Sequence, residues 1–134
     1  MVSKVDNKKT GDLGELITAN WLENKGYTIL NLKYLKKYGE IDVVAQKDLT
    51  VHFIEVKTVS YETRQALEYA VTHETWRPEE QVHKKKQFQI SKAIEAWLAE
   101  YRYTGDFQID VAAVRIVPRE TYATINFLDN VIFE

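Results

Sequence analysis

Residues 39–57 read GEIDVVAQKDLTVHFIEVK and decide the fold. At the period of a strand, Glu40 and Asp42 share one face of the first part of this stretch, and its apolar residues occupy the other. Residues 47–50 interrupt the pattern. Residues 51–57 then form an almost continuous apolar run, which is typical of a buried strand. The stretch therefore predicts a β-hairpin in the protein core.

The second strand of this hairpin ends with an acid and a base, Glu55 and Lys57, on one face. Burying either charge is unfavourable unless the two pair or meet another ion. In a hairpin, Asp42, Glu55 and Lys57 can converge on one small volume. Two carboxylates supply the oxygen ligands that Mg²⁺ prefers, and a lysine beside the ion can orient or deprotonate a water. The alternative is an ordinary ion pair on a strand, and these residues alone leave both interpretations open.

The composition is that of an ordinary globular protein. The chain has 134 residues, of which 45% are hydrophobic and 28% charged, and this predicts a single domain over residues 1–134. No stretch has the length and apolar character of a membrane span, so no membrane partner is expected. The absence of cysteine excludes disulfides and thiolate chemistry and fits a cytoplasmic protein. The net charge of −2 conceals two lysine clusters that favour anionic ligands locally: Lys33, Lys36 and Lys37, and Lys84, Lys85 and Lys86.

The N-terminal part predicts one helix. Residues 1–9 are polar and predict a flexible tail. Residues 10–25 show helical spacing, and Gly26 is a typical C-terminal stop. Glu15 has two interpretations here: a functional acid, or the end of a capping box that begins at Asp12. The apolar stripe consists of Leu13, Leu16, Ile17 and Trp21.

The middle of the chain combines a clear strand with an ambiguous segment. Residues 27–35 begin with β-branched and aromatic side chains and predict a strand. Residues 60–77 have no strong periodicity. They are consistent with a mobile loop over a substrate, a short helix indicated by Ala66, Leu67, Ala70 and Val71, a spacer, or a contact between two copies in a homodimer.

Pro78, followed by two acids, predicts the start of a long helix. One turn before Ile90, the core face of this helix carries Lys86, while Lys84 and Lys85 point elsewhere. Lys86 therefore either faces an anionic site or extends past the edge of the core into water. The core face itself consists of apolar residues at three- and four-residue spacing: Ile90, Ala93, Ile94, Trp97, Leu98 and Tyr101.

Residues 107–117 and 122–127 predict two further strands, with a turn at 118–121. Asp110 is the single acid inside the first of them, and it either joins a hydrogen-bond network or marks a sheet edge. The order of elements is a helix, three strands, an uncertain segment, a helix and two strands. This order predicts an α/β fold with a central mixed sheet of about five strands flanked by helices.

These residues together resemble a known bacterial family. The chain carries Gly11-x-x-Gly14-Glu15, Gly26-Tyr27, Gly39-Glu40-Ile41-Asp42 and Phe53-Ile54-Glu55-Val56-Lys57, with Val82 and Lys86 on the later helix and Ile109-Asp110-Val111 on the later strand. This combination resembles the YraN family. That family is similar to the PD-(D/E)XK nuclease superfamily and, within it, to archaeal Holliday-junction resolvases. The resemblance implies a restriction-endonuclease-like core. Ile41 stands where the superfamily pattern has proline, as is ordinary in the resolvase-like branch.

The resemblance also implies a set of site residues. Asp42 matches the motif aspartate, and Glu55, Val56 and Lys57 match the (D/E)XK tripeptide. Asp42, Glu55 and the carbonyl of Val56 would then bind Mg²⁺ or Mn²⁺, and Lys57 would position the attacking water. Glu15 matches an acid on the first helix that holds a second metal or a metal-bound water.

The basic residues complete this implied site. Lys86 and Gln87 match a helical position that binds the scissile or an adjacent phosphate. The catalytic set is therefore Glu15, Asp42, Glu55, Lys57 and Lys86. The two lysine clusters would follow the DNA backbone and recognise its shape and charge rather than its bases.

The expected function is a metal-dependent, structure-specific endonuclease that acts on branched or single-stranded DNA. Two alternatives remain, because a fold does not prove an activity. One is a catalytically inactive nucleic-acid-binding module that keeps the lysine clusters. The other is a protein-interaction or assembly factor of the same fold that relies on residues 60–77.

Overall fold

The computed structural model of the protein describes residues 4–73 and 83–132. Among them, none of the helices has the length and apolar character needed to cross a membrane. The elements follow one another as α1 (Lys4–Asn24), β1 (Thr28–Lys36), β2 (Gly39–Lys47), β3 (Thr50–Ser60), α2 (Arg64–His73), α3 (Lys84–Glu100), β4 (Asp106–Val117), the short 3₁₀ helix η2 (Pro118–Glu120) and β5 (Tyr122–Leu128).

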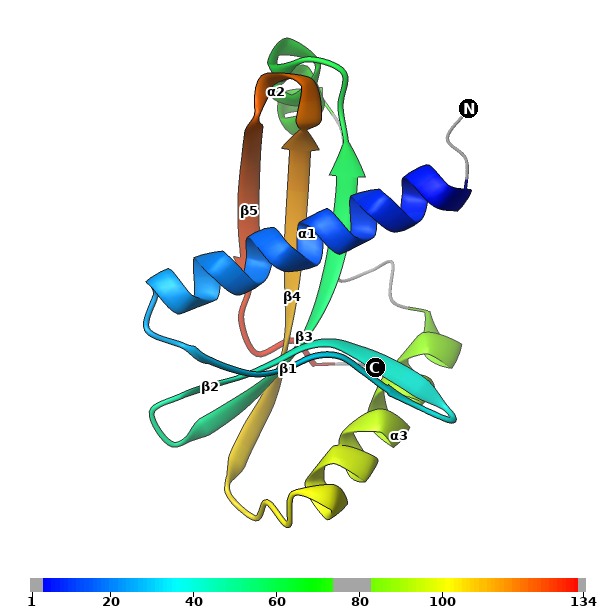
Figure 1. The fold of residues 1–134 in the computed structure, drawn as a ribbon, viewed down its shortest axis with the longest axis vertical. Helices are drawn as coiled ribbons and strands as arrows, with labels where there is room; N and C mark the ends of the chain where they lie inside the picture. The colour runs from blue at the N-terminus through cyan, green and yellow to red at the C-terminus, as the bar shows by residue number, and fades with distance from the viewer. Residues whose placement is uncertain (1–3, 74–82, 133–134) are drawn as a thin grey trace.

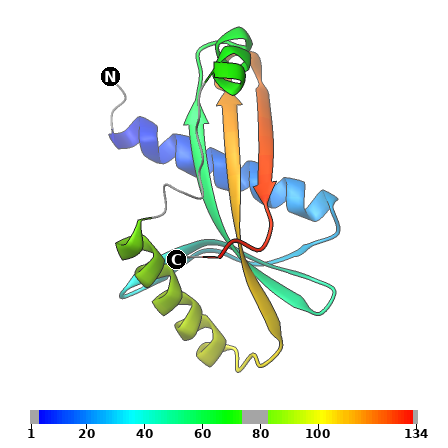
Figure 2. The ribbon, with the colours of Figure 1, turned by 180° about the vertical axis from the view of Figure 1, so that it is seen from behind.

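The five strands form one mixed sheet in the order β1-β2-β3-β4-β5. Strands β3 and β4 are parallel, and the other neighbouring pairs are antiparallel. Figure 1 shows α1 crossing in front of β3, β4 and β5, with β1 and β2 running across the direction of β4 and β5. From behind, α3 lies on the opposite side of the sheet from α1 (Figure 2). This architecture is the predicted α/β fold and fits a restriction-endonuclease-like core.

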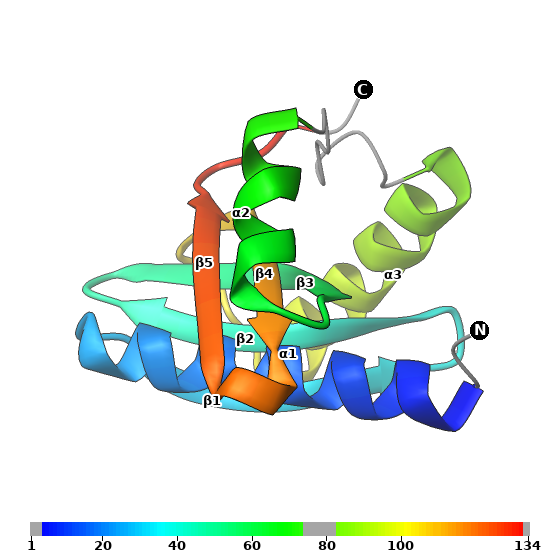
Figure 3. The same cartoon turned by 90° about the horizontal axis from the view of Figure 1, so that it is seen from above.

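Two apolar clusters attach the helices to the two faces of the sheet. Helix α3 buries four of the six residues of its predicted face, Ile90, Ala93, Ile94 and Trp97, against strand residues that include Phe53. Leu98 is partly buried, and Tyr101, just past the end of the helix, is 49% exposed. The cluster beneath α1 combines Leu22 with side chains from three strands: Val43, Ala45, Ile54 and Ala112. Seen from above, α1 and α3 enclose β2 and β3 between them (Figure 3). Because both faces of these two strands are covered, polar side chains on them must be paired or functional.

Helix α1 begins earlier and is rotated relative to the prediction. It starts at Lys4 rather than at residue 10, and it ends before Gly26, whose φ of +93° allows the predicted stop. Leu16 of the predicted stripe is 54% exposed, whereas Thr18 is fully buried. A Cβ on Gly14 would lie 1.8 Å from Thr58 Oγ1, so glycine is what lets α1 approach β3 this closely. The predicted stripe was wrong in part: the buried residues of α1 include Gly14, Thr18, Ala19 and Leu22, and Trp21 of the predicted stripe packs at the edge of the cluster beneath the helix.

The segment between β3 and α3 is partly helical. The short-helix interpretation of residues 60–77 is confirmed by α2, which buries Leu67 and Ala70. Residues 74–82, which include the predicted helix start at Pro78, lie outside the described residues. Helix α3 itself begins at Lys84, because His83 has extended backbone with ψ of 159°. The prediction that α3 starts at Pro78 is therefore wrong.

Candidate functional site

The acidic site lies where β2 and β3 separate. The β2–β3 ladder extends only as far as Val43 and Ile54. Beyond that pair, β2 continues along β1 and β3 continues along β4. The N–H of Val56 donates instead to the carboxylate of Asp42, at 2.8 Å from Oδ2. Because the N–H and C=O of one strand residue point to the same side, the Val56 carbonyl is directed toward the same opening.

Asp42 is held in an environment that disfavours its charge. Burial, followed by the neighbouring carboxylate of Glu55, raises the pKa of Asp42 to about 7. The hydrogen bond from the Val56 N–H and the more distant ammonium of Lys86 oppose this shift but do not cancel it. A carboxyl group with this pKa can lose its proton at neutral pH when a cation approaches.

Glu55 presents its two oxygens to different surroundings. The residue is only 5% exposed, and Oε1 lies 3.6 Å from Lys57 Nζ and 3.7 Å from Lys86 Nζ. The other oxygen, Oε2, is buried and has no hydrogen-bond partner among the described residues. An unpartnered buried carboxylate oxygen is costly, and a bound cation would satisfy it. Asp42, Glu55 and Lys57 are thus brought together as the hairpin predicted.

Glu15 and Glu40 extend this group of acids. Each of Glu15, Glu40 and Asp42 offers a carboxylate oxygen within 4.8 Å of the others. The capping-box interpretation of Glu15 is wrong, because Asp12 lies well inside α1 rather than at its start. Burial raises the pKa of Glu15, and the hydrogen bond from Lys33 counteracts part of that rise. Glu40 was missed as a site residue, although its strand spacing from Asp42 indicated a shared face.

Lys33 pairs with two acids of α1, although its side chain remains 49% exposed. Its Nζ lies 2.6 Å from Asp12 Oδ1 and 2.5 Å from Glu15 Oε2, and these hydrogen bonds raise the pKa of Lys33. The β1–β2 register places Lys33 opposite Asp42. Its backbone has a φ of +52°, a left-handed conformation that costs about 1–3 kcal/mol for a side chain of this kind. The backbone of Lys33 is therefore strained at the position where its ammonium group lies beside the candidate metal ligands.

The other predicted basic residues divide into engaged and exposed ones. Lys36 Nζ lies 3.0 Å from Glu100 Oε1, so this lysine is paired. Gln87 is partly buried in the first turn of α3. The remaining members, Lys37, Lys84 and Lys85, are exposed. Contact of these residues with nucleic acid stays a prediction.

A second polar cluster lies on β3 and β4 and at the end of β5, on the side of the sheet that α1 covers. His52 Nδ1 is 2.6 Å from Asp110 Oδ2, and Gln108 Nε2 donates to the other Asp110 oxygen and to Asp129. Burial alone would raise the pKa of Asp110, but the hydrogen bonds from His52, the Asn130 backbone and Gln108 outweigh it and lower the pKa. Asp110 thus joins a hydrogen-bond network, one of its two predicted roles. Because these groups satisfy one another, the network fits a structural link between β3, β4 and the end of β5.

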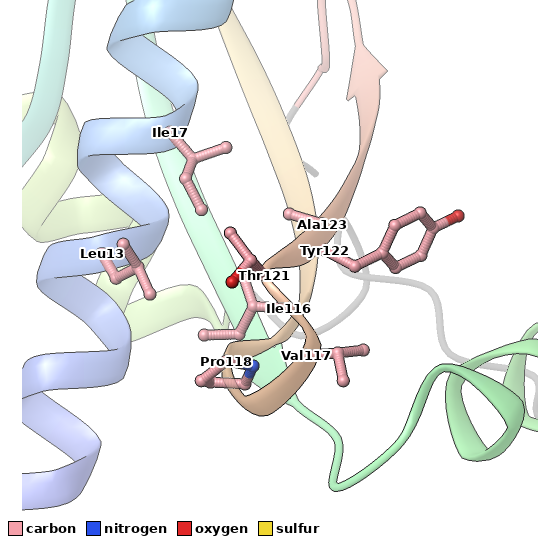
Figure 4. Close-up of a pocket in the computed structure, with 8 residues that line it drawn as sticks. All are labelled: Leu13, Ile17, Ile116, Val117, Pro118, Thr121, Tyr122 and Ala123. Atoms are coloured by element: carbon pink, nitrogen blue, oxygen red, sulfur yellow. The ribbon is translucent and has the colours of Figure 1, made fainter.

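An apolar cavity of about 390 Å³ lies away from the acids, between α1 and the β4–β5 turn. Figure 4 shows Leu13 and Ile17 on α1 facing Ile116 and Pro118 across it. Its lining is almost entirely apolar and provides neither a metal ligand nor a general base. The acids where β2 and β3 separate, rather than this cavity, are therefore the candidate functional site.

The comparisons with known proteins agree with one another. The profile of uncharacterised protein family UPF0102 matches residues 14–114. A UPF0102 protein of Alkaliphilus oremlandii is 33% identical over 127 residues, which cover 92% of this chain and 97% of the relative. A UPF0102 protein of Campylobacter fetus is 32% identical over 125 residues, covering 92% and 93%. The match spans α1 and the acids of β2 and β3, and the chain belongs to the uncharacterised protein family UPF0102.

Proposed function

We propose that the protein is a metal-dependent endonuclease of the PD-(D/E)XK type that hydrolyses phosphodiester bonds in branched or single-stranded DNA. The observation that carries the proposal is the arrangement around Glu55. One of its oxygens faces two ammonium groups, and the other is buried without a hydrogen-bond partner among the described residues, beside Asp42. The neighbouring acids and the unsatisfied oxygen could bind a cation, and the two lysines could bind a phosphate in the same site.

The residues present fit a hard divalent cation. Among residues 4–73 and 83–132, the side chains that can act as ligands here are carboxylates, and no histidine joins the group of Glu15, Glu40 and Asp42. This donor set favours Mg²⁺ or Mn²⁺ over zinc or copper. Asp42, Glu55 and the Val56 carbonyl would hold the ion, with Glu15 and Glu40 near enough to hold its waters or a second ion. The ion would activate a water and neutralise charge on the phosphoryl oxygen.

Lys57 and Lys86, whose ammonium groups both lie near Glu55, would have separate roles. Lys57 lies on β3 beside the ligands, where its ammonium can orient the attacking water or stabilise developing negative charge. Lys86 reaches the same Glu55 oxygen from α3, so it can contact a phosphate that enters between the helix and the sheet. The exposed lysines Lys37, Lys84 and Lys85 would attract the rest of the DNA backbone. In this proposal the protein acts in the cytoplasm.

Cleavage of labelled single strands, flaps and four-way junctions in Mg²⁺ or Mn²⁺ tests the proposal. We expect Asp42→Ala and Glu55→Ala to abolish cleavage, while binding in EDTA persists or tightens because negative charge facing the phosphate is lost. Lys86→Ala is expected to slow cleavage on the order of 100-fold, and Lys84→Ala, on the exposed side of the same helix, far less.

Three results would contradict this proposal. Unchanged cleavage in Asp42→Ala and Glu55→Ala would place the activity elsewhere. Equal effects of Lys86→Ala and Lys84→Ala would reduce Lys86 to a surface lysine. Tight DNA binding without cleavage by the parent protein would favour the inactive binding module instead.

A further inference from the structure

The tip of the β1–β2 hairpin and the outer side of α3 form a second feature close to the acids. A cavity of about 310 Å³ is lined there by Tyr38, Phe88 and Lys92. Its volume is at the lower end of the range for small-molecule sites. Tyr38 comes from the hairpin, and Phe88 and Lys92 lie one turn apart on α3, so two separate elements supply its walls.

The two walls are held together by close backbone contact. A Cβ on Gly39 would lie 2.5 Å from the carbonyl oxygen of Gln89 on α3. Glycine is therefore required where the hairpin meets the helix. Tyr38 directly precedes Gly39, and Phe88 directly precedes Gln89, so the two rings flank this contact. The backbone positions that carry the two rings are thus set by contact between two regular elements.

Both rings are exposed, and a lysine stands over each. Tyr38 is 57% exposed and Phe88 59%. Lys37 Nζ lies 5.3 Å from the centre of the Tyr38 ring, and Lys92 Nζ lies 5.4 Å from that of Phe88. Exposed aromatic faces combined with ammonium groups are the two components with which proteins bind single-stranded nucleic acids: stacking for the bases and positive charge for the phosphates.

The position of this cavity relates it to the acidic site. Tyr38 lies in the turn just before β2 and precedes Asp42 by four residues, roughly 13 Å at the rise of a strand. Phe88 follows Lys86 by two residues, so it lies about 3 Å further along α3 but about 200° around the helix, on the exposed side that also carries Lys84. A strand whose phosphate contacts Lys86 would therefore have to pass around the first turns of α3, or over the hairpin tip, before one of its bases reached the rings.

We infer that the cavity of Tyr38, Phe88 and Lys92 binds an unpaired base of single-stranded DNA at the hairpin tip, on the flank of the acidic site. This inference rests on the proposed function and defines its substrate as DNA with unpaired bases. A duplex hides its base faces in the stack, so it could use the lysines but not the rings. An apolar segment of a protein could cover the rings, but it would gain nothing from Lys37 and Lys92.

Binding measurements in EDTA test the inference apart from cleavage. The probe is a fluorescein-labelled thymidine oligonucleotide, compared by anisotropy with a second one whose central nucleotides lack their bases. We expect the parent protein to bind the intact strand about 5- to 100-fold more tightly than the abasic one, given the usual contribution of one stacked base. Tyr38→Ala and Phe88→Ala should each reduce this preference, and Tyr38→Phe should preserve it.

A matched control and a second substrate make the outcome decisive. Tyr69 on α2 is similarly exposed, at 64%, and Tyr69→Ala should leave the preference unchanged. Equal affinity of the parent for intact and abasic strands would overturn the inference, and so would binding of blunt duplex as tight as that of the single strand. If the preference is found but no variant cleaves DNA in Mg²⁺ or Mn²⁺, the base-binding cavity stands and the endonuclease proposal fails.

Discussion

The carboxyl groups of Asp42 and Glu55 lie side by side in the protein interior, where each raises the energy of the other's charge. A pair of apolar or amide side chains would be better for stability at this position. The acids therefore destabilise the protein in the absence of a cation, and this cost can be measured.

We expect Asp42→Asn to stabilise the protein above neutral pH. An unfolded aspartate ionises near 3.8, whereas folded Asp42 keeps its proton up to about 7. Between these values the native state binds more protons than the unfolded state, so raising the pH through this window lowers the free energy of unfolding. Asparagine avoids that loss, which is at most about 4 kcal/mol, and its amide can still accept from the Val56 N–H and donate to Glu55.

Thermal unfolding at pH 5 and pH 8 checks this prediction. The melting temperature of Asp42→Asn should exceed that of the parent by several degrees at pH 8, with a smaller difference at pH 5. Asp48→Asn makes the same chemical change on the exposed turn of this hairpin and should have no effect. A lower melting temperature for Asp42→Asn at pH 8 would show that the carboxylate is stabilised by its surroundings.

The residue scale also shows where sequence reasoning reached its limit. The convergence of Asp42, Glu55 and Lys57 was predictable, because strand period and a short turn fix which side chains share a face. The place of Lys33 was not predictable. Strand period cannot anticipate a left-handed residue with φ of +52°, which turns this lysine toward Glu15. Lys33 and Lys36 are thus both paired with acids, although each side chain stays close to half exposed.

At the scale of elements, the spacing of large apolar side chains predicted the buried face of a helix only where the helix packs on the sheet at the usual distance. The buried face of α3 followed the predicted spacing of Ile90, Ala93, Ile94 and Trp97. Helix α1 did not, because its buried residues, Gly14, Thr18, Ala19 and Leu22, lie outside the predicted stripe. Hydrophobic periodicity carries no information about a close approach that depends on a missing side chain. The short helix α2 was equally hard to predict, since only Leu67 and Ala70 are buried.

We expect Gly14→Ala to destabilise the protein by about 1–3 kcal/mol, as overpacking of a close contact does. The added methyl group would collide with Thr58 Oγ1 and push α1 away from β3. Glu15 is the next residue, so it would leave the acid cluster and the affinity for Mn²⁺ should fall as well. Chemical denaturation and calorimetric titration measure the two effects.

Gly11 provides the control on the same helix. A Cβ there would meet nothing within 4 Å, so Gly11→Ala should stabilise the helix by up to about 1 kcal/mol. Adding Thr58→Ala to Gly14→Ala should recover part of the lost stability, because it removes the atoms that collide first. Equal effects of the two glycine substitutions would mean that Gly14 is not a contact glycine.

At the scale of the whole molecule, the sheet divides at the candidate site. Strands β1 and β2 continue one way with α3, and β3, β4 and β5 continue the other way with α1 crossing them (Figure 1). Asp42 and Glu40 belong to the first part, Glu55 and Lys57 to the second, and Glu15 to α1. An ion bound by these acids would therefore join elements that the β2–β3 ladder does not hold together beyond Val43, and its binding should raise global stability.

We expect Mg²⁺ or Mn²⁺ to raise the melting temperature more at pH 8 than at pH 6. A ligand that binds only the native state stabilises it by RT ln(1 + [L]/Kd). With its pKa near 7 in the ion-free protein, Asp42 must lose a proton to bind a cation at pH 6. The apparent affinity should therefore fall by up to about tenfold per pH unit below 7.

Thermal unfolding without ions, with ions, and after EDTA has removed the ions measures this shift in melting temperature. Asp42→Asn and Glu55→Gln should remove the shift. If the shift survives in both variants, the ion binds elsewhere, and the group of His52, Asp110 and Asp129 would then be the place to look.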